Sequence, residues 1–125
     1  MHEELFEIKP ISCQIRIIEE SDLDSLLLVK SDASVHTDRL KQQKNGEAVY
    51  LGAFINNYAI GYVLLSLENK EDVMPYTNRE KCADMIDLLI IEPLRNYGIG
   101  SRLALACEKC CKENAIPYLG LDVNP

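Results

Sequence analysis

Tryptophan is absent from this 125-residue chain, and no apolar run approaches the length of a membrane span. A spanning helix needs about 20 consecutive apolar residues, so we expect no integral membrane segment. The chain starts on an acidic stretch, Met1-His2-Glu3-Glu4, which lacks the basic and apolar regions of a secretory signal. These absences favour a cytoplasmic protein.

Basic residues are also scarce, with 13 Lys and Arg against 20 Asp and Glu and a net charge of −7. The resulting negative field repels phosphate backbones and anionic lipids, so we expect neither nucleic acid nor a membrane as partner. The same field favours a cationic ligand such as an amine. The five cysteines show neither paired CxxC motifs nor a Cys/His spacing, and we therefore predict reduced thiols without a metal site.

The composition that remains is typical of one folded domain spanning residues 1–125. Hydrophobic residues make up 47% of the chain and charged residues 26%. Apolar and alternating runs predict strands at 14–18, 48–54, 58–67, 83–91 and 118–123, with helices at about 22–29 and 99–114. Residues 31–44 predict a weak second helix or a mobile segment, and residues 68–81 predict an exposed loop. This order predicts an α/β (α+β) fold with a mixed sheet.

Several local predictions follow from single residue types. Ser21 offers an N-cap for the first helix. The Asn56-Asn57 pair tolerates the positive φ angles of a tight hairpin turn. Side chains alternate along a strand, so Asp84 and Asp87 are predicted on opposite faces. His36 belongs to no motif and is predicted at the surface.

Residues 95–101 carry the clearest functional signal, because they join an apolar strand to the start of an amphipathic helix. A helix start leaves four backbone N–H groups unpaired and carries a partial positive charge. Gly98 and Gly100 let the backbone close around phosphate oxygens, and Arg95 adds a charge-assisted bond from the side. We therefore predict a diphosphate site that needs no metal.

Other interpretations of these glycines remain open. A dinucleotide-binding fingerprint needs a third glycine where Leu103 stands, although Asp122 follows about 20 residues later, as a ribose-binding acid would. This alternative predicts a nucleotide-dependent oxidoreductase. Ser101-Arg102 replaces the Lys-Ser/Thr pair of a P-loop, which excludes that motif. A tight turn without a ligand is the remaining alternative.

One further interpretation is a family resemblance. The pattern Arg95-x-x-Gly98-x-Gly100 follows Leu88-Leu89-Ile90-Ile91 and precedes Ser101-Arg102-Leu103. It resembles the (Gln/Arg)-x-x-Gly-x-(Gly/Ala) signature of the GNAT superfamily of acyl-CoA N-acyltransferases. The order of strands and helices resembles that fold from about Ile15 to the last residue. The resemblance implies a mixed, mostly antiparallel central sheet flanked by helices.

The resemblance implies acetyl-CoA as cofactor, bound where the 83–91 and 118–123 strands splay apart. The pantetheine arm would pair with the 88–91 backbone like an added strand, and the pyrophosphate would lie on N–H groups from Asn96 to Ser101. Asn124 matches an asparagine that commonly touches the cofactor arm. The implied cofactor-binding residues are Leu88, Leu89, Ile90, Ile91, Arg95, Asn96, Tyr97, Gly98, Ile99, Gly100, Ser101 and Asn124.

The implied reaction is direct transfer of an acetyl group to a primary amine of a small molecule or protein. A backbone N–H near Leu89 or Ile90 would bind the oxyanion. Asp84 is the candidate base, because it lies on the same strand and is predicted to share a face with Ile90. Asp87 is the alternative base.

The chain departs from the family pattern at Pro125. The family usually continues with a helix whose tyrosine protonates the leaving thiolate, followed by two further strands. We therefore expect either a shortened copy or a homodimer in which a second subunit completes the sheet edge. The alternative function is a non-catalytic acyl-CoA-binding or dimerising remnant of the fold.

Overall fold

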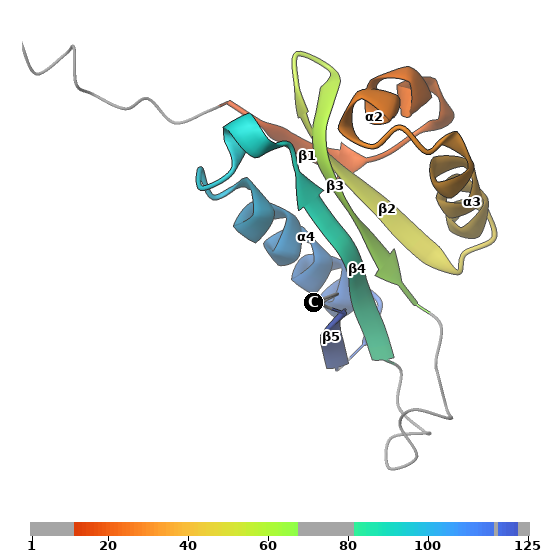
Figure 1. Cartoon of the computed structure of the whole chain (residues 1–125). Helices are drawn as coiled ribbons and strands as arrows, with labels where there is room; N and C mark the ends of the chain where they lie inside the picture. Colours follow the sequence, from red (N-terminus) through yellow and green to blue (C-terminus); the bar gives the residue numbers. More distant parts are fainter. Residues whose placement is uncertain (1–11, 68–81, 117, 123–125) are drawn as a thin grey trace, which may run out of the picture.

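The computed structural model describes residues 12–67, 82–116 and 118–122. Its centre is a five-stranded sheet in the order β1-β2-β3-β4-β5 (Figure 1). The strands are β1 (Gln14–Ile17), β2 (Ala48–Ile55), β3 (Tyr58–Ser66), β4 (Cys82–Ile90) and β5 (Tyr118–Asp122). β1 to β4 are antiparallel, and β5 is parallel to β4. The prediction of a mixed, mostly antiparallel sheet is confirmed.

Helices cover both faces of this sheet. α2 (Leu23–Val29) and α3 (Ala33–Lys44) lie on one side, and α4 (Ile99–Glu113) lies on the other (Figure 1). Two 3-10 turns, η1 (Glu20–Asp22) and η3 (Glu92–Leu94), precede α2 and α4. Residues 33–44 are therefore helical, so of the two alternatives for this stretch, a second helix or a mobile segment, the helix is confirmed. None of the helices in the described residues has the length and apolarity needed to cross a membrane.

The two faces bury separate apolar clusters. On the α4 face, Ile99, Leu103 and Cys107 pack against the sheet at the helical spacing expected of an amphipathic helix. Burial raises the pKa of the Cys107 thiol to about 12, so this cysteine is a protonated core residue. Among the described residues, Cys13, Cys107, Cys110 and Cys111 are free.

The face covered by α2 and α3 holds the largest buried aromatic side chains. Tyr50 and Tyr62 are fully buried there, together with Phe54. His36 is also fully buried, so its predicted place at the surface is wrong. Burial is tolerated because both ring nitrogens are bonded, Nδ1 to the Tyr50 hydroxyl and Nε2 to the Lys30 carbonyl, each at 2.8 Å.

The start of the first helix also differs from its prediction. Ser21 does not cap α2, and the chain instead turns through η1, where the Glu19 N–H donates to the Asp22 carboxylate at 2.8 Å. Arg16 of β1 holds the same carboxylate through two bonds of 2.8 and 2.9 Å. An ion pair from a neighbouring strand thus decides where this turn begins. The Asn56-Asn57 turn is confirmed, with φ angles of 52° and 67°.

A bulge in β4 changes which side chains share a face. Leu64 pairs with Ile86 and Tyr62 pairs with Leu89, so Asp87 and Leu88 together lie opposite a single residue of β3. Asp87 has a φ of +55°, and its carboxylate bonds to Tyr62 on the α2 and α3 face. Alternation from Ile86 places Asp84 on that same face, so the prediction of opposite faces is wrong.

The bulge also separates Asp84 from Ile90. Ile90 packs in the α4-side cluster, whereas Ile86 packs in the cluster of the other face. Because Asp84 alternates with Met85 and shares the side of Ile86, it does not share a face with Ile90. That prediction fails because strict alternation does not hold across the extra residue.

Candidate functional site

A hollow of about 260 Å³ lies where β4 ends and α4 begins. Seven of its eight lining residues are predicted cofactor-binding residues, and Leu94 is the eighth. The lining consists of Ile90, Leu94, Arg95, Asn96, Gly98, Ile99, Gly100 and Ser101. Hollows of about 360 Å³ between α2 and α3 and about 350 Å³ beside the β2–β3 turn contain none of the predicted site residues. The structure therefore gathers most of the predicted set in one place.

The backbone around this hollow leaves several N–H donors without a helical acceptor. Asn96 and Gly98 have φ angles of +70° and +80°, and α4 begins directly after Gly98. No side chain caps this helix, and the Arg102 N–H donates to the Gly98 carbonyl at 3.1 Å. The N–H groups of Ile99, Gly100 and Ser101 precede that bond and have no helical acceptor. Such a set of donors is suited to bind an anion.

The end of β4 offers backbone groups along its outer edge. The Ile91 N–H donates to the Ile60 carbonyl of β3 at 2.9 Å. Since antiparallel strands alternate their bonding direction, the backbone groups of Ile90, which lies outside the bulge, point away from β3. β5 pairs with β4 only over Cys82–Ile86 in the described residues. The Ile90 carbonyl accepts a bond of 2.9 Å from Arg95 Nε, which ties the arginine to the strand end.

The remaining predicted cofactor residues lie around this edge but do not line the hollow. Leu88 is 38% exposed, and Tyr97 is 53% exposed. Leu89 packs against the α2 and α3 cluster, and Ile91 packs against the α4 cluster. Asn124 lies outside the described residues.

Asp84 lies at the other end of β4, opposite Gly120 of β5. It is partly exposed, and a Cβ built on Gly120 would lie 2.5 Å from Asp84 Oδ1. The carboxylate therefore occupies space that only a glycine leaves free. Along the strand, Asp84 is about 20 Å from Ile90 at about 3.3 Å per residue, so the structure does not bring it to the hollow.

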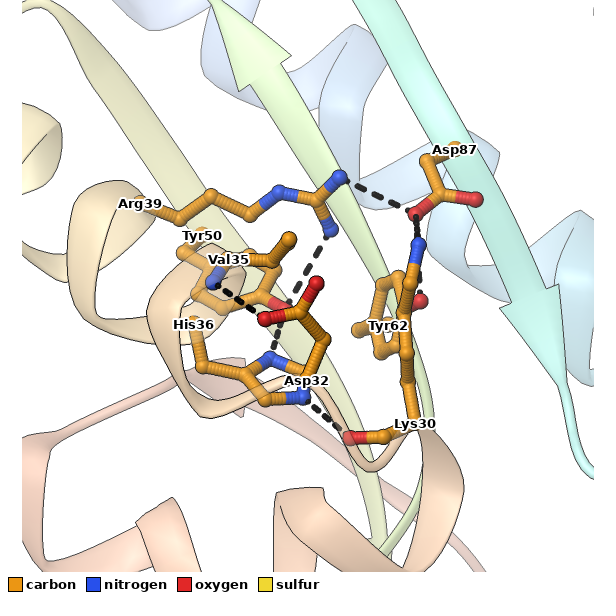
Figure 2. A network of polar contacts seen from close by, with 8 residues as sticks. All are labelled: Lys30, Asp32, Val35, His36, Arg39, Tyr50, Tyr62 and Asp87. Carbon is orange, nitrogen blue, oxygen red and sulfur yellow. Dashed lines mark hydrogen bonds and ion pairs between the residues drawn. The ribbon is translucent and has the colours of Figure 1, made fainter.

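Asp87 is held at the bulge by three donors to one oxygen. Lys30 Nζ, Arg39 Nη2 and the Tyr62 hydroxyl approach Oδ2 at 3.2, 3.0 and 3.1 Å (Figure 2). Burial alone would raise the pKa of Asp87, but the bonds from Arg39, Lys30 and Tyr62 outweigh it and lower the pKa. Asp87 is therefore ionised and a weaker base than a free aspartate.

A second set of bonds holds Arg39 and His36 in place. The Lys30 carbonyl can only accept, so His36 Nε2 carries a proton and a neutral ring accepts at Nδ1 from the Tyr50 hydroxyl. Arg39 Nη1 in turn donates to the Tyr50 oxygen at 3.4 Å. This network could not be predicted from the sequence, because Lys30 and Asp87 are 57 positions apart and belong to no common motif.

Comparisons with known proteins agree with this architecture. The sequence profile of the acetyltransferase (GNAT) family matches residues 15–125. A transcriptional regulator from Bacillus halodurans C-125 superposes with a TM-score of 0.76 at 16% identity, over 90% of this chain and 83% of that chain. A GNAT family acetyltransferase from Staphylococcus aureus gives 0.72 at 20% identity, over 92% and 89%. The PaiA N-acetyltransferase from Thermoplasma acidophilum, in complex with coenzyme A, gives 0.68 at 19% identity, over 85% and 76%.

No curated protein matches the chain by sequence at a significant level. At these identities the superpositions establish the fold, and the profile match establishes the family. Together they confirm the resemblance inferred from residues 95–100 and from the order of the elements.

Proposed function

The chain belongs to the acetyltransferase (GNAT) family, and from this premise we propose that it is an N-acetyltransferase. It transfers the acetyl group of acetyl-CoA directly to a primary amine of a small molecule or protein. The observation that carries this proposal is the hollow at the start of α4, whose lining combines Arg95, two glycines and the free N–H groups of a helix start. Those features suit a diphosphate such as that of coenzyme A.

The space around the two glycines fits this group. A Cβ built on Gly98 meets no atom within 4 Å, and one built on Gly100 meets only Leu88 Cδ2, at 3.8 Å. Both positions are therefore open toward the hollow. The N–H groups of Ile99, Gly100 and Ser101 would hold the pyrophosphate there.

The strand edge provides the other contacts of the proposed site. Acetyl-CoA supplies an activated acyl group, as a thioester, when it is bound. The backbone groups of Leu88 and Ile90 would bond to its amide arm in the manner of an added strand. The outward N–H of Ile90 is the donor best placed to stabilise negative charge on the acyl oxygen.

A base is also needed, because an amine is protonated at neutral pH and attacks only after losing its proton. Asp84, the base that the family resemblance implies, lies about 20 Å along β4 from Ile90 and on the other face, so a single water cannot join it to an amine at the acyl group. We therefore do not assign the base to Asp84. Asp87 is a poor alternative, because its bonds to Lys30, Arg39 and Tyr62 lower its pKa.

The proposal is tested by CoA release from acetyl-CoA in the presence of a panel of primary amines, with two variants of Gly100. Gly100 lies in the first turn of α4 and needs no positive φ, so both variants are expected to fold. Gly100→Glu places bulk and negative charge on the pyrophosphate position and should abolish CoA binding and release. Gly100→Ala is the matched control, because the family signature accepts alanine at this position.

Unchanged CoA binding in Gly100→Glu would contradict the proposed site. CoA binding by the parent chain without release for any amine would contradict the enzymatic proposal and favour an acyl-CoA-binding protein.

A further inference from the structure

Three charged side chains meet at the β4 bulge, and their charges do not cancel. Lys30 and Arg39 both bond to Asp87, at 3.2 and 3.0 Å, so the group carries one positive charge in excess. Burial raises the pKa of Tyr50 and of Tyr62, so both phenols stay neutral. This local excess occurs in a chain whose net charge is −7.

Asp32 feels the charge of Lys30 but does not bond to it, and it leaves the excess in place. Asp32 caps the start of α3, where its carboxylate accepts bonds from the Ser34 hydroxyl at 2.7 Å and the Val35 N–H at 3.3 Å. Its side chain is exposed to solvent, which screens its charge.

The positions of the two cations are fixed before any ligand binds. Arg39 is 12% exposed and lies over the rings of Tyr50 and Tyr62, at 5.5 and 5.4 Å from their centroids. Lys30 is 37% exposed and is therefore the more accessible charge. Asp87 holds both through Oδ2, so little side-chain entropy remains to be lost on binding.

The bulge brings this group next to the proposed acyl site. Asp87 directly precedes Leu88, whose backbone belongs to the edge that we assign to the cofactor arm. α4 covers one face of β4, so an acceptor amine has to approach from the other face or past the edge (Figure 1). Asp87, Lys30 and Arg39 lie on that other face (Figure 2).

We propose that Lys30 and Arg39 bind an anionic group of the acceptor, so that the preferred substrate is a primary amine that also carries a carboxylate or phosphate. This inference rests on the proposed acetyltransferase function. It reverses the expectation from overall composition, because a local cation pair outweighs a distant net charge at contact range.

The experiment compares matched amines that differ in the anionic group. The pairs are β-alanine against β-alaninamide and O-phosphoethanolamine against ethanolamine, with kcat/KM obtained from CoA release. We expect the anionic member to be preferred by at least about tenfold, as for a hydrogen bond to a charged group. The pair with the larger preference distinguishes a carboxylate from a phosphate.

The Lys30→Gln variant tests whether Lys30 is responsible for the preference for the anionic amine. It removes the charge and leaves the Lys30 carbonyl, which His36 uses, in place. The preference for the anionic amine should fall by roughly tenfold or more, because the KM for that amine rises. CoA binding should stay unchanged. Lys30→Arg should restore the preference. Lys109→Gln is the control, because Lys109 is an exposed lysine of α4 on the opposite face, and it should leave the preference intact.

Each outcome separates the two proposals. If the parent chain neither binds CoA nor releases it from acetyl-CoA, the acetyltransferase proposal is contradicted. CoA release without preference for the anionic member, or an equal loss for both members in Lys30→Gln, would overturn only the inference about the acceptor. Were no amine in these pairs turned over, CoA-bound protein should still bind N-acetyl-β-alanine more tightly than its amide, and equal binding would overturn the inference.

Discussion

At the residue scale, the two aspartates of β4 have different environments although they are three positions apart. Asp87 is bonded by two cations and a phenol, whereas Asp84 is partly exposed beside Gly120. A carboxylate stabilised in its charged form is a weak base, so Asp87 is suited to hold Lys30 and Arg39 and not to take a proton. Among the described residues Asp84 makes no such bonds, but it lies about 20 Å along β4 from Ile90.

Asp84→Asn tests whether this distance excludes Asp84 from proton transfer. The substitution keeps the shape of the side chain against Gly120 and removes the ability to take a proton. We expect kcat and CoA binding to stay unchanged, because Asp84 lies about 20 Å along β4 from Ile90. A fall in kcat of roughly a hundredfold or more would show that Asp84 takes the proton of the amine.

The Arg16–Asp22 ion pair predicts a loss of stability in acid. The bond from Arg16 lowers the pKa of Asp22 below its ordinary value of 3.8, although burial opposes the shift. The stabilisation is therefore complete above the pKa of the unfolded chain and is lost as pH falls through the lower folded pKa. Asp22→Asn should cost about 1–3 kcal/mol at neutral pH, and its difference from the parent should shrink below about pH 4.

Urea unfolding between pH 3 and 7 measures this difference, with Asp24→Asn of α2 as the exposed control. A difference between parent and Asp22→Asn that does not change with pH would contradict the assigned ion pair.

The site residues that can be predicted from the sequence are those whose neighbours in the chain form a recognisable pattern. Gly98 and Gly100 are recognisable because they sit between an apolar strand and an amphipathic helix, and they line the hollow. Lys30, Arg39 and His36 belong to no such pattern. Their places depend on how α3 packs on β2 and on the bulge, both of which are tertiary features.

At the element scale, periodicity predicted the strands and helices but not the β4 bulge. An alternating pattern assumes one residue per position of the partner strand. The extra residue at Asp87 breaks this assumption, and nothing in the run Asp84 to Ile90 marks the break. For this reason two predictions are wrong, that Asp84 and Asp87 lie on opposite faces and that Asp84 and Ile90 share a face.

The close approach of β3 and β4 beyond the bulge predicts a strong effect at Gly61. A Cβ built there would collide with Ile90 Cδ1 and lie 2.8 Å from the Leu89 carbonyl oxygen. Because a backbone atom cannot move aside cheaply, Gly61→Ala should destabilise the fold by about 1–3 kcal/mol. The variant should also weaken CoA binding, since Ile90 lines the hollow.

Denaturant unfolding checks this prediction, with Gly100→Ala as the control, since its new methyl group meets only ordinary contacts. Equal stability of the Gly61→Ala variant and the parent would show that β3 and β4 are further apart than described.

At the scale of the whole molecule, the sheet separates two sites. α4 lies on one side of the sheet, and α2 and α3 lie on the other (Figure 1). The proposed cofactor site is at the start of α4, and the charged cluster is on the α2 and α3 side. The order of the strands and helices correctly predicted the mixed sheet. The net charge of −7 favours a cationic acceptor, whereas the local cluster favours an anionic group on it, because a net charge does not tell where individual lysines and arginines lie.

The melting temperature of the chain, measured separately with acetyl-CoA, CoA, NAD and ATP, tests the central claim most directly. A ligand at about 100 times its dissociation constant stabilises a fold by about 2.7 kcal/mol. We predict a clear rise with acetyl-CoA and CoA, none with NAD, and loss of the rise in Gly100→Glu. A rise with NAD alone, or no rise with either CoA ligand, would contradict the assignment of the α4 hollow to an acyl-CoA.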